Sequence, residues 1–377
     1  MVAGLRRLSE ADLNGKRVVM RADFNVPIND GRITSRKRII EALPTIKYLM
    51  DKSAGLTLLS HLGRPQKPGP EFSLAPVKYE LEKFLGINVQ LISNLGIHAS
   101  EKLSILENTR FFGGEERNDD DLARTLSSFG DVFVFDAFGV AHRNHASVSG
   151  IAKYLPAYAG FLVERELDFL SELMDNIKRP YMVVMGGSKI SDKINLINSF
   201  RKLSDTVLVG GALATSFLKA EGYQVGMSRY DSEGDAKKIL SSEKADKLRL
   251  PNDVIVEDQQ GKTRETVVTR IRQEEAVFDI GSKTAGDYAE VLKKAKTIVF
   301  NGPLGMVEDP RFRAGTKRIC EAIRESGAIS VACGGDTAAF IESEGLEDCF
   351  SYVSTGGGAF LEALEGRELP GLKAIVR

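Results

Sequence analysis

The stretch that decides the fold is Met185-Gly186-Gly187-Ser188-Lys189-Ile190-Ser191-Asp192-Lys193-Ile194. It follows the apolar run 181–184, which is typical of a buried strand. Apolar residues at 190, 194 and 197 then recur at a helical spacing. The pattern therefore predicts a strand, a glycine turn and a helix. Glycines let a backbone approach a ligand closely, and the amides at the start of a helix favour an anion.

Two lysines of this stretch suggest which anion it could hold. Lys189 and Lys193 are four residues apart and would share one face of the predicted helix, where their charges repel unless an anion lies between them. A polyphosphate would be such an anion. Taken alone, the stretch favours a surface helix with two solvated lysines, because glycine turns between strands and helices are common and this one matches neither standard nucleotide fingerprint.

Length and composition narrow the classes of protein. A chain of 377 residues predicts two domains, and 42% hydrophobic residues are enough for a core in each. A net charge of -1 argues against a general nucleic-acid binder. We find no apolar run of membrane-spanning length and no hydrophobic signal at the start, so we expect neither a membrane span nor export. The three cysteines, Cys320, Cys333 and Cys349, form no CxxC pair, which favours a reducing cytoplasm.

Short apolar runs alternate with helical patterns along both halves of the chain. The predicted strands are 16–20, 56–59, 103–106 and 132–135, then 181–184, 206–209, 297–300 and 329–332. This alternation predicts α/β architecture with doubly wound parallel sheets, whose ligands sit at the carboxyl ends of the strands. We expect two α/β domains that face different ligands. The first would span 1–156 and the second 179–358, joined by an amphipathic helix within 157–178.

In the first half, arginines follow the predicted strands or open a helix. These arginines are Arg38, Arg64, Arg110 and Arg143, and they stand near Asp23, Asn25, His61 and His142. Several guanidinium groups at equivalent positions specify a small, highly anionic ligand. Any one of them alone would more simply be a solvated surface residue, and the histidines could be structural. No spacing typical of a histidine metal site or a nucleophilic triad accompanies them.

In the second half, the strands end in glycines. Gly334-Gly335-Asp336-Thr337 offers one carboxylate at a phosphate-binding turn, the minimum for Mg²⁺, although Asp336 could simply cap the next helix. Three consecutive glycines at 356–358 are a stronger signal, because they are costly in backbone entropy. No Walker loop is present. We therefore expect a nucleotide site of another kind.

The chain resembles the phosphoglycerate kinase family over nearly its whole length. The motifs that carry the resemblance follow one another in the family's order: RADFNVP from 21, SHLGRP from 60, LENTRF from 106, FDAFGVAHRNHAS from 135, GGSKISDKI from 186, VGGALATSF from 209, NGPLGMVE from 301, GGDTAAF from 334 and VSTGGGAFLEALEG from 353. Nine such motifs in series do not arise by chance.

The resemblance implies reversible phosphoryl transfer from 1,3-bisphosphoglycerate to ADP, giving 3-phosphoglycerate and ATP with Mg²⁺, in glycolysis and gluconeogenesis. It also implies two Rossmann-like domains that face a central cleft and are joined by a helix. The protein would be a cytoplasmic monomer whose tail, about 359–377, packs back on the first domain. Phosphoglycerate would be held by Asp23, Asn25, Arg38, His61, Arg64, Arg110 and Arg143. The nucleotide would meet Gly187, Lys189, Lys193, Gly210, Gly211, Asn301, Pro303, Glu308, Gly335, Asp336, Thr337, Gly356 and Gly357, with Asp336 at the metal. Arg38, Lys189 and Gly358 would be the catalytic residues.

The chemistry implied is one of alignment. The carboxylate of an acyl phosphate is a good leaving group, so transfer needs charge stabilisation and positioning rather than a strong base. Domain closure would bring the two substrates into line and exclude water. Two other classes stay open: a nicotinamide dehydrogenase, which should carry GxGxxG after its first strand, and a non-catalytic nucleotide-binding protein, which would not need the arginines.

Overall fold

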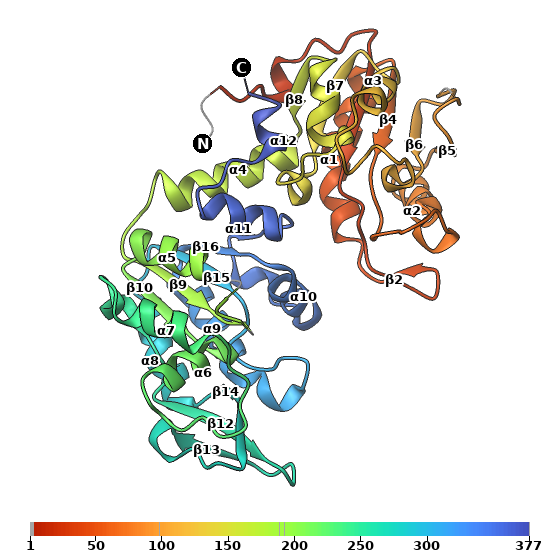
Figure 1. Cartoon of the computed structure of the whole chain (residues 1–377). Coiled ribbons are helices and arrows are strands. Elements are labelled where there is room, and N and C mark those ends of the chain that lie inside the picture. The colour runs from red at the N-terminus through yellow and green to blue at the C-terminus, as the bar shows by residue number, and fades with distance from the viewer. Residues whose placement is uncertain (1–3, 98, 188, 192, 377) are drawn as a thin grey trace. The chain divides into compact units, whose positions relative to one another are not determined.

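The computed structural model describes residues 4–97, 99–187, 189–191 and 193–376 (Figure 1). Ser188 and Asp192 of the glycine turn lie outside the described residues. The chain forms two compact units, one made by Met1–Asp168 with Arg367–Arg377 and the other by Phe169–Gly366. Each unit has its own hydrophobic core and its own parallel sheet, and each is described by itself below.

The sheet of the first unit has six parallel strands in the order β5-β6-β4-β1-β7-β8. Their bounds are β1 Arg17–Ala22, β4 Gly55–Leu59, β5 Gln90–Ile92, β6 Leu103–Leu106, β7 Val132–Asp136 and β8 Ala157–Ala159. The chain starts in the middle at β1, adds strands on one side, and returns to add β7 on the other. The strand order therefore reverses between β1 and β7, which is where ligands bind in open sheets of this kind.

Helices and a hairpin complete the first unit. The helices are α1 Lys37–Lys52, α2 Ala75–Leu85, α3 Asp120–Ser127 and the short α12 Pro370–Lys373, and the hairpin pairs β2 Ile28–Asn29 with β3 Arg32–Ile33. Helix α1 contributes Ile39, Ile46 and Leu49 to the same core as the β1 and β4 side chains. Pro44 is accommodated inside this helix.

Helix α4, Phe161–Met174, begins in the first unit at a buried carboxylate. Oδ1 of Asp136, at the end of β7, accepts hydrogen bonds from the amides of Leu162 and Val163 at 2.9 and 3.2 Å. Burial raises the pKa of Asp136 to about 7. The strand that leads into the arginine and histidine motif is thereby tied to the first turn of α4.

The main sheet of the second unit is also parallel throughout, with the order β11-β10-β9-β15-β16-β17, in which β10 and β11 are added one after the other on the same side of β9. Its strands are β9 Tyr181–Met185, β10 Thr206–Val209, β11 Leu248–Arg249, β15 Thr297–Asn301, β16 Ile329–Ala332 and β17 Tyr352–Val353. The helices are α5 Ile194–Leu203, α6 Gly211–Ala220, α7 Glu233–Leu240, α8 Ser282–Leu292, α9 Ala314–Ser326, α10 Gly335–Glu344 and α11 Gly358–Leu364. Here the order reverses between β9 and β15.

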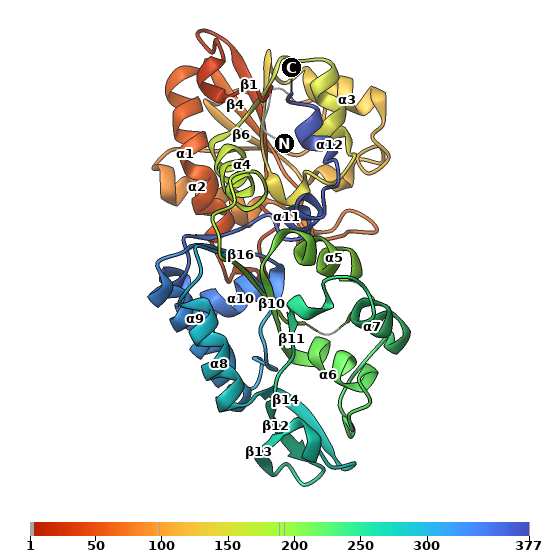
Figure 2. The ribbon, with the colours of Figure 1, turned by 90° about the vertical axis from the view of Figure 1, so that its left-hand side faces the viewer.

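The structure differs from the sequence-based ranges in three places. Residues 157–159 form β8, which pairs with β7, so the connecting helix begins only at Phe161. Helix α11 belongs to the second unit, where it contacts α5, and only the residues from Arg367 join the first. An antiparallel sheet of β12 Asp253–Asp258, β13 Thr263–Val267 and β14 Glu275–Ile280 was not predicted (Figure 2).

The final residues are held in the first unit by a close backbone approach at Gly371. Its amide donates to the carbonyl oxygen of Ala141 at 2.8 Å. A Cβ atom at this position would lie 2.8 Å from the ring of Phe135 and 3.0 Å from a methyl group of Val148. A larger residue would therefore push α12 off the unit.

We predict that Gly371→Ala lowers the free energy of unfolding by about 1–3 kcal/mol through overpacking. Urea unfolding of the whole chain measures the change. Gly286→Ala is the matched control, because Gly286 lies in α8 with open space around it, and there alanine should stabilise by about 0.5–1 kcal/mol. Equal effects of the two substitutions would contradict a packed tail.

Candidate active site

The first unit gathers charged side chains at the carboxyl ends of its strands. Asp23 follows β1, is 7% exposed, and forms an ion pair with Arg38 in the first turn of α1. His61 follows β4 and is 5% exposed. Parallel strands bring these ends to one edge of the sheet, so residues far apart in sequence meet there.

Hydrogen bonds between neighbouring loops fix this edge. The Asn25 side chain accepts from the amide of Gly63 at 2.8 Å, and the Ser60 hydroxyl accepts from the amide of Phe24 at 2.8 Å. Arg110, on the short turn after β6, donates to the carbonyl oxygen of Gly63. The loops after β1, β4 and β6 are thus joined to one another.

Two more predicted arginines lie within electrostatic reach of this group. Arg64 and Arg143 are exposed, and both lower the pKa of Arg110, to which burial contributes most. His142 is partly buried next to Arg143, and His145 behind them is buried. The structure therefore brings together all seven residues predicted to hold phosphoglycerate.

The cluster carries fixed charges at neutral pH. Burial opposes ionisation of Asp23, but Arg38, His61 and Arg21 outweigh it and lower the pKa of this carboxyl to about 2. Burial lowers the pKa of His61 to about 3, and Asp23 only partly offsets the effect. The edge thus presents a carboxylate, a neutral imidazole and several guanidinium groups, an excess of positive charge suited to a small polyanion.

In the second unit, backbones approach one another closely where the strand order reverses. The amide of Gly186, after β9, donates to the carbonyl oxygen of Asn301 at 2.9 Å, and a Cβ atom on Gly186 would lie 1.8 Å from the carbonyl oxygen of Pro303. Gly211 adopts a φ of +64° and donates to the carbonyl oxygen of Leu304 at 2.8 Å. Side chains are excluded from this turn, so main-chain groups form its surface.

Polar side chains connect the same turn to its neighbours. Nζ of Lys193 donates to the carbonyl oxygen of Gly186 at 2.7 Å and to Oδ1 of Asn301 at 2.9 Å. The hydroxyl of Thr337, in α10, accepts from the amide of Gly302 at 2.7 Å. Hydrogen bonds or close backbone contacts at this turn involve seven of the residues predicted to bind the nucleotide, namely Gly187, Lys193, Gly210, Gly211, Asn301, Pro303 and Thr337.

Lys189 and Lys193 do not share a helix face, contrary to the prediction, because α5 begins only at Ile194. Ile190 and Ser191, which precede it, are held instead by a carboxylate. Asp231 accepts from the amides of Ile190 and Ser191 at 2.7 and 3.2 Å, and from the Ser191 hydroxyl at 2.7 Å. Lys189 itself is exposed and contributes to lowering the pKa of Asp231.

The remaining predicted residues stand at the borders of the turn. Gly335 and Asp336 open α10 and are exposed, and the exposed Glu308 follows β15. Gly356 donates its amide to the Ser354 hydroxyl at 3.0 Å, Gly357 has a φ of +50°, and Gly358 begins α11. Among the described residues, no group of three or more metal-ligating side chains occurs. Asp336 therefore offers a single carboxylate.

Three residues near these sites were given no role from the sequence. Arg21 is buried beside His61, and Asp231 holds the lysine turn. Glu115 is 1% exposed and accepts from the amide and hydroxyl of Ser147, directly behind the arginines. Arg21 stands inside the quoted RADFNVP motif, whereas Glu115 and Asp231 lie in segments whose spacing gives no signal.

Comparison with known proteins identifies one family over nearly the whole chain. The family model described as phosphoglycerate kinase matches residues 8–367. A phosphoglycerate kinase of Thermosipho africanus is 46% identical, covering 98% of this chain and 97% of its own length. The chain belongs to the phosphoglycerate kinase family.

Solved structures agree. The phosphoglycerate kinase of Coxiella burnetii superposes with a TM-score of 0.90 at 40% identity, and that of Pyrococcus horikoshii with 0.86 at 32%, each covering 98% of both chains. These findings confirm the resemblance, the two parallel-sheet fold and the enzyme class predicted above. The family's enzymes are glycolytic kinases that transfer a phosphoryl group between 1,3-bisphosphoglycerate and ADP, and this excludes the dehydrogenase and the non-catalytic alternatives.

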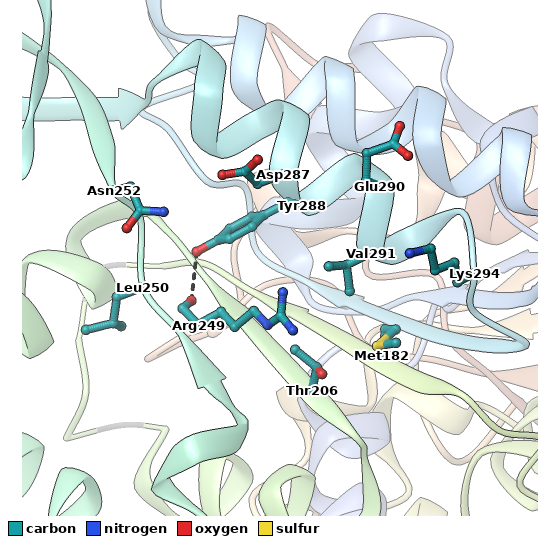
Figure 3. Close-up of a pocket in the computed structure, with 10 residues that line it drawn as sticks. All are labelled: Met182, Thr206, Arg249, Leu250, Asn252, Asp287, Tyr288, Glu290, Val291 and Lys294. Atoms are coloured by element: carbon teal, nitrogen blue, oxygen red, sulfur yellow. Dashed lines mark hydrogen bonds between the residues drawn. The ribbon is translucent and has the colours of Figure 1, made fainter.

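A surface hollow of about 610 Å³ in the second unit holds none of these residues (Figure 3). Met182 and Thr206 contribute to its floor from the amino-terminal ends of β9 and β10, and Tyr288 of α8 lies beside them. The family's glycine turns follow the opposite ends of these strands. The hollow is therefore separate from the candidate active site.

None of the helices in the described part of the chain has the length and hydrophobicity that a membrane-spanning helix needs.

We predict that Asp231→Ala raises the KM for ATP about tenfold. The substitution removes three hydrogen bonds from the turn that carries Lys189, and reordering one backbone residue costs about 1–2 kcal/mol on binding. Steady-state kinetics with varied ATP measure the change. Asp235→Ala in α7 is the control, since Asp235 pairs only with the exposed Lys238 in the described contacts. An unchanged or lower KM for ATP would refute a supporting role for Asp231.

Proposed function

We propose that the two clusters divide the substrates of the family's reaction between the units, phosphoglycerate on the first and the nucleotide on the second. The observation that carries this proposal is the contrast in chemistry. The first cluster is built from guanidinium groups around Asp23 and His61, and the second from close-packed glycine backbone beside Lys193. Guanidinium forks suit a compact anion, and an exposed backbone suits a phosphate chain.

In the first unit, Arg64, Arg110 and Arg143 bind the phosphate that is not transferred. Asp23, Asn25 and His61 bind the hydroxyl and carboxyl groups of the substrate. Arg38 lies at the side of the reacting carboxyl, where its ion pair with Asp23 holds it in place. Asp23 can do this because its pKa of about 2 keeps it ionised throughout the physiological range.

In the second unit, the nucleotide phosphates bind along the turn formed by Gly187, Gly210 and Gly211, with Lys189 and Lys193 as their cationic partners. Asn301, Pro303 and Glu308 contact the nucleoside, and Gly335, Thr337 and Gly356–Gly357 complete the site. Lys193 is already directed to the turn by its bonds to Gly186 and Asn301. These roles follow the family pattern, residue by residue.

The residues at this turn fit a Mg²⁺ ion that arrives with the nucleotide. Asp336 is exposed in the first turn of α10, and Mg²⁺ is commonly held by one or two carboxylates together with phosphate oxygens and waters. A single carboxylate could not retain the ion without the phosphates. When bound, Mg²⁺ supplies positive charge to the nucleotide phosphates.

The transfer step rests on charge and alignment. The acyl-phosphate carboxylate leaves without a proton, so the chain supplies no general base. Arg38 and Lys189 stabilise the negative charge of the moving phosphoryl group, and the amide of Gly358 at the start of α11 donates to it. The two substrates must meet in line with water excluded. We also propose that the enzyme acts as a cytoplasmic monomer, as the family resemblance implies.

A coupled assay tests the function directly. The purified chain should form ATP from ADP and 1,3-bisphosphoglycerate generated in the assay, with Mg²⁺ present, and should run in reverse from ATP and 3-phosphoglycerate. ADP replaced by AMP is the control, because AMP lacks the β-phosphate that accepts the group in ADP. Absence of ATP formation by the folded chain would refute the proposal.

We predict that Arg38→Ala lowers kcat by about 10³-fold or more, the scale expected for an arginine that stabilises a transferring phosphoryl group. Steady-state rates at saturating substrates measure the change. Arg36→Ala is the matched control, because Arg36 lies two residues earlier and pairs with Glu80, away from Asp23. A normal kcat in Arg38→Ala would remove this residue from the transfer step.

We predict a different effect for Arg64→Ala. Because Arg64 would hold the phosphate that is not transferred, its loss should weaken phosphoglycerate binding about 10- to 100-fold, the range for a hydrogen bond to a charged group, and should change kcat little. Calorimetric titration with 3-phosphoglycerate measures the affinity. Wild-type affinity in the variant would exclude this role.

A further inference from the structure

Arg21 is a fully buried cation at the candidate phosphoglycerate site, with 1% of its surface exposed. Its Nη1 donates to the carbonyl oxygens of Ala22 and Leu59 at 2.6 and 3.2 Å, and its Nη2 lies 3.2 Å from Nδ1 of His61. No described residue accepts a hydrogen bond from its Nε. A buried charge with an unsatisfied donor opposes folding. Stability alone therefore does not account for an arginine at this position.

The contact with Arg21 determines where the His61 ring carries its proton. A guanidinium has only N–H donors, so Nδ1 of His61 must accept. Burial lowers the pKa of His61 to about 3, so the ring is neutral at physiological pH. A neutral imidazole that accepts at Nδ1 has its proton on Nε2.

We propose that Arg21 is a positioning residue that holds His61 as the Nε2–H tautomer, so that His61 donates a hydrogen bond to an anionic oxygen of the bound phosphoglycerate. The proposal rests on the assignment of the first unit to that substrate. Within the described part of the chain, no group bonds to Nε2 of His61, which leaves this donor for a ligand. The opposite tautomer would turn a lone pair toward the anion and repel it.

The burial of Arg21 decides that it acts through His61. A side chain with 1% of its surface exposed does not reach a substrate in solution, whereas the arginines at the rim do. The electrostatic effects of Glu115 and Asp23 favour its charged form against the cost of burial. Arg21 thus remains a cation, and its hydrogen-bonding direction cannot reverse.

Nitrogen-15 NMR of the ligand-free protein tests the first half of the proposal. The spectrum should show His61 with a protonated Nε2 and an unprotonated Nδ1 between pH 6 and 8. His61→Gln assigns the signal among the four histidines of the chain. A His61 ring protonated on Nδ1, or on both nitrogens in this range, overturns the proposal. This measurement uses no substrate, so its failure is distinct from a failure of the proposed function, which would appear as wild-type protein that makes no ATP.

Kinetics of Arg21→Met test the second half. Methionine fills the buried space without a donor, so His61 should lose its fixed tautomer and the KM for 3-phosphoglycerate should rise about 10- to 100-fold, the range for a hydrogen bond to a charged group, with the KM for ATP unchanged. Arg17→Met is the matched control on the same strand, because Arg17 pairs with Asp131 at an exposed site and should leave both KM values unchanged.

Arg21→Lys separates positioning from packing. A lysine that still donates to Nδ1 should restore the Nε2–H signal and most of the affinity for 3-phosphoglycerate. If Arg21→Met keeps a single Nε2–H tautomer together with the wild-type KM, the proposal is overturned. If the methionine variant does not fold, the wild-type tautomer and the lysine variant still decide: an Nε2–H signal in both, with near-normal KM in the lysine variant, supports the proposal.

Discussion

The direction of the strands is the constraint on which the rest of the structure depends. In both main sheets every described strand runs parallel to its neighbours, so all carboxyl ends of a sheet fall on one edge. Asp23, His61, Arg110 and Arg143 are separated by up to 120 positions in the sequence, yet each follows a strand and reaches that edge. The same rule gathers Gly186, Gly210 and Asn301 in the second unit. The topology of each sheet therefore determines where these residues lie, independently of the contacts that their side chains make.

This constraint explains why so much could be predicted from the sequence. Strands buried on both faces appear as short apolar runs, and 103–106, 206–209 and 329–332 were predicted with the bounds that the structure has. The polar or glycine motif after each run then indicated that the ligand sites lie at the carboxyl ends of the strands. The arginine cluster followed from position alone, because residues at equivalent strand ends must converge.

What could not be predicted depends on contacts between distant segments. The start of α5 was placed too early because the apolar spacing at 190, 194 and 197 is helical, whereas the amides of Ile190 and Ser191 bond to Asp231, forty residues away. The antiparallel sheet β12–β14 was missed because its strands carry many partly exposed residues and interrupt an otherwise regular alternation. Likewise, the motif around Arg21 was visible, but its burial against His61 was not.

The two clusters proposed to bind phosphate are built in opposite ways. In the first unit, long cationic side chains surround a buried frame of Arg21, Asp23 and Glu115. The charges of Glu115 and Asp23 favour the charged form of Arg21, and Arg21 helps to lower the pKa of Asp23. Removing these charges from water costs free energy, and we infer that fixed directions of hydrogen bonding are what the buried charges provide in return. In the second unit, the absence of side chains at Gly186 and Gly211 lets backbone segments pack closely against one another, and Lys193 donates to the carbonyl oxygen of Gly186 and to Oδ1 of Asn301.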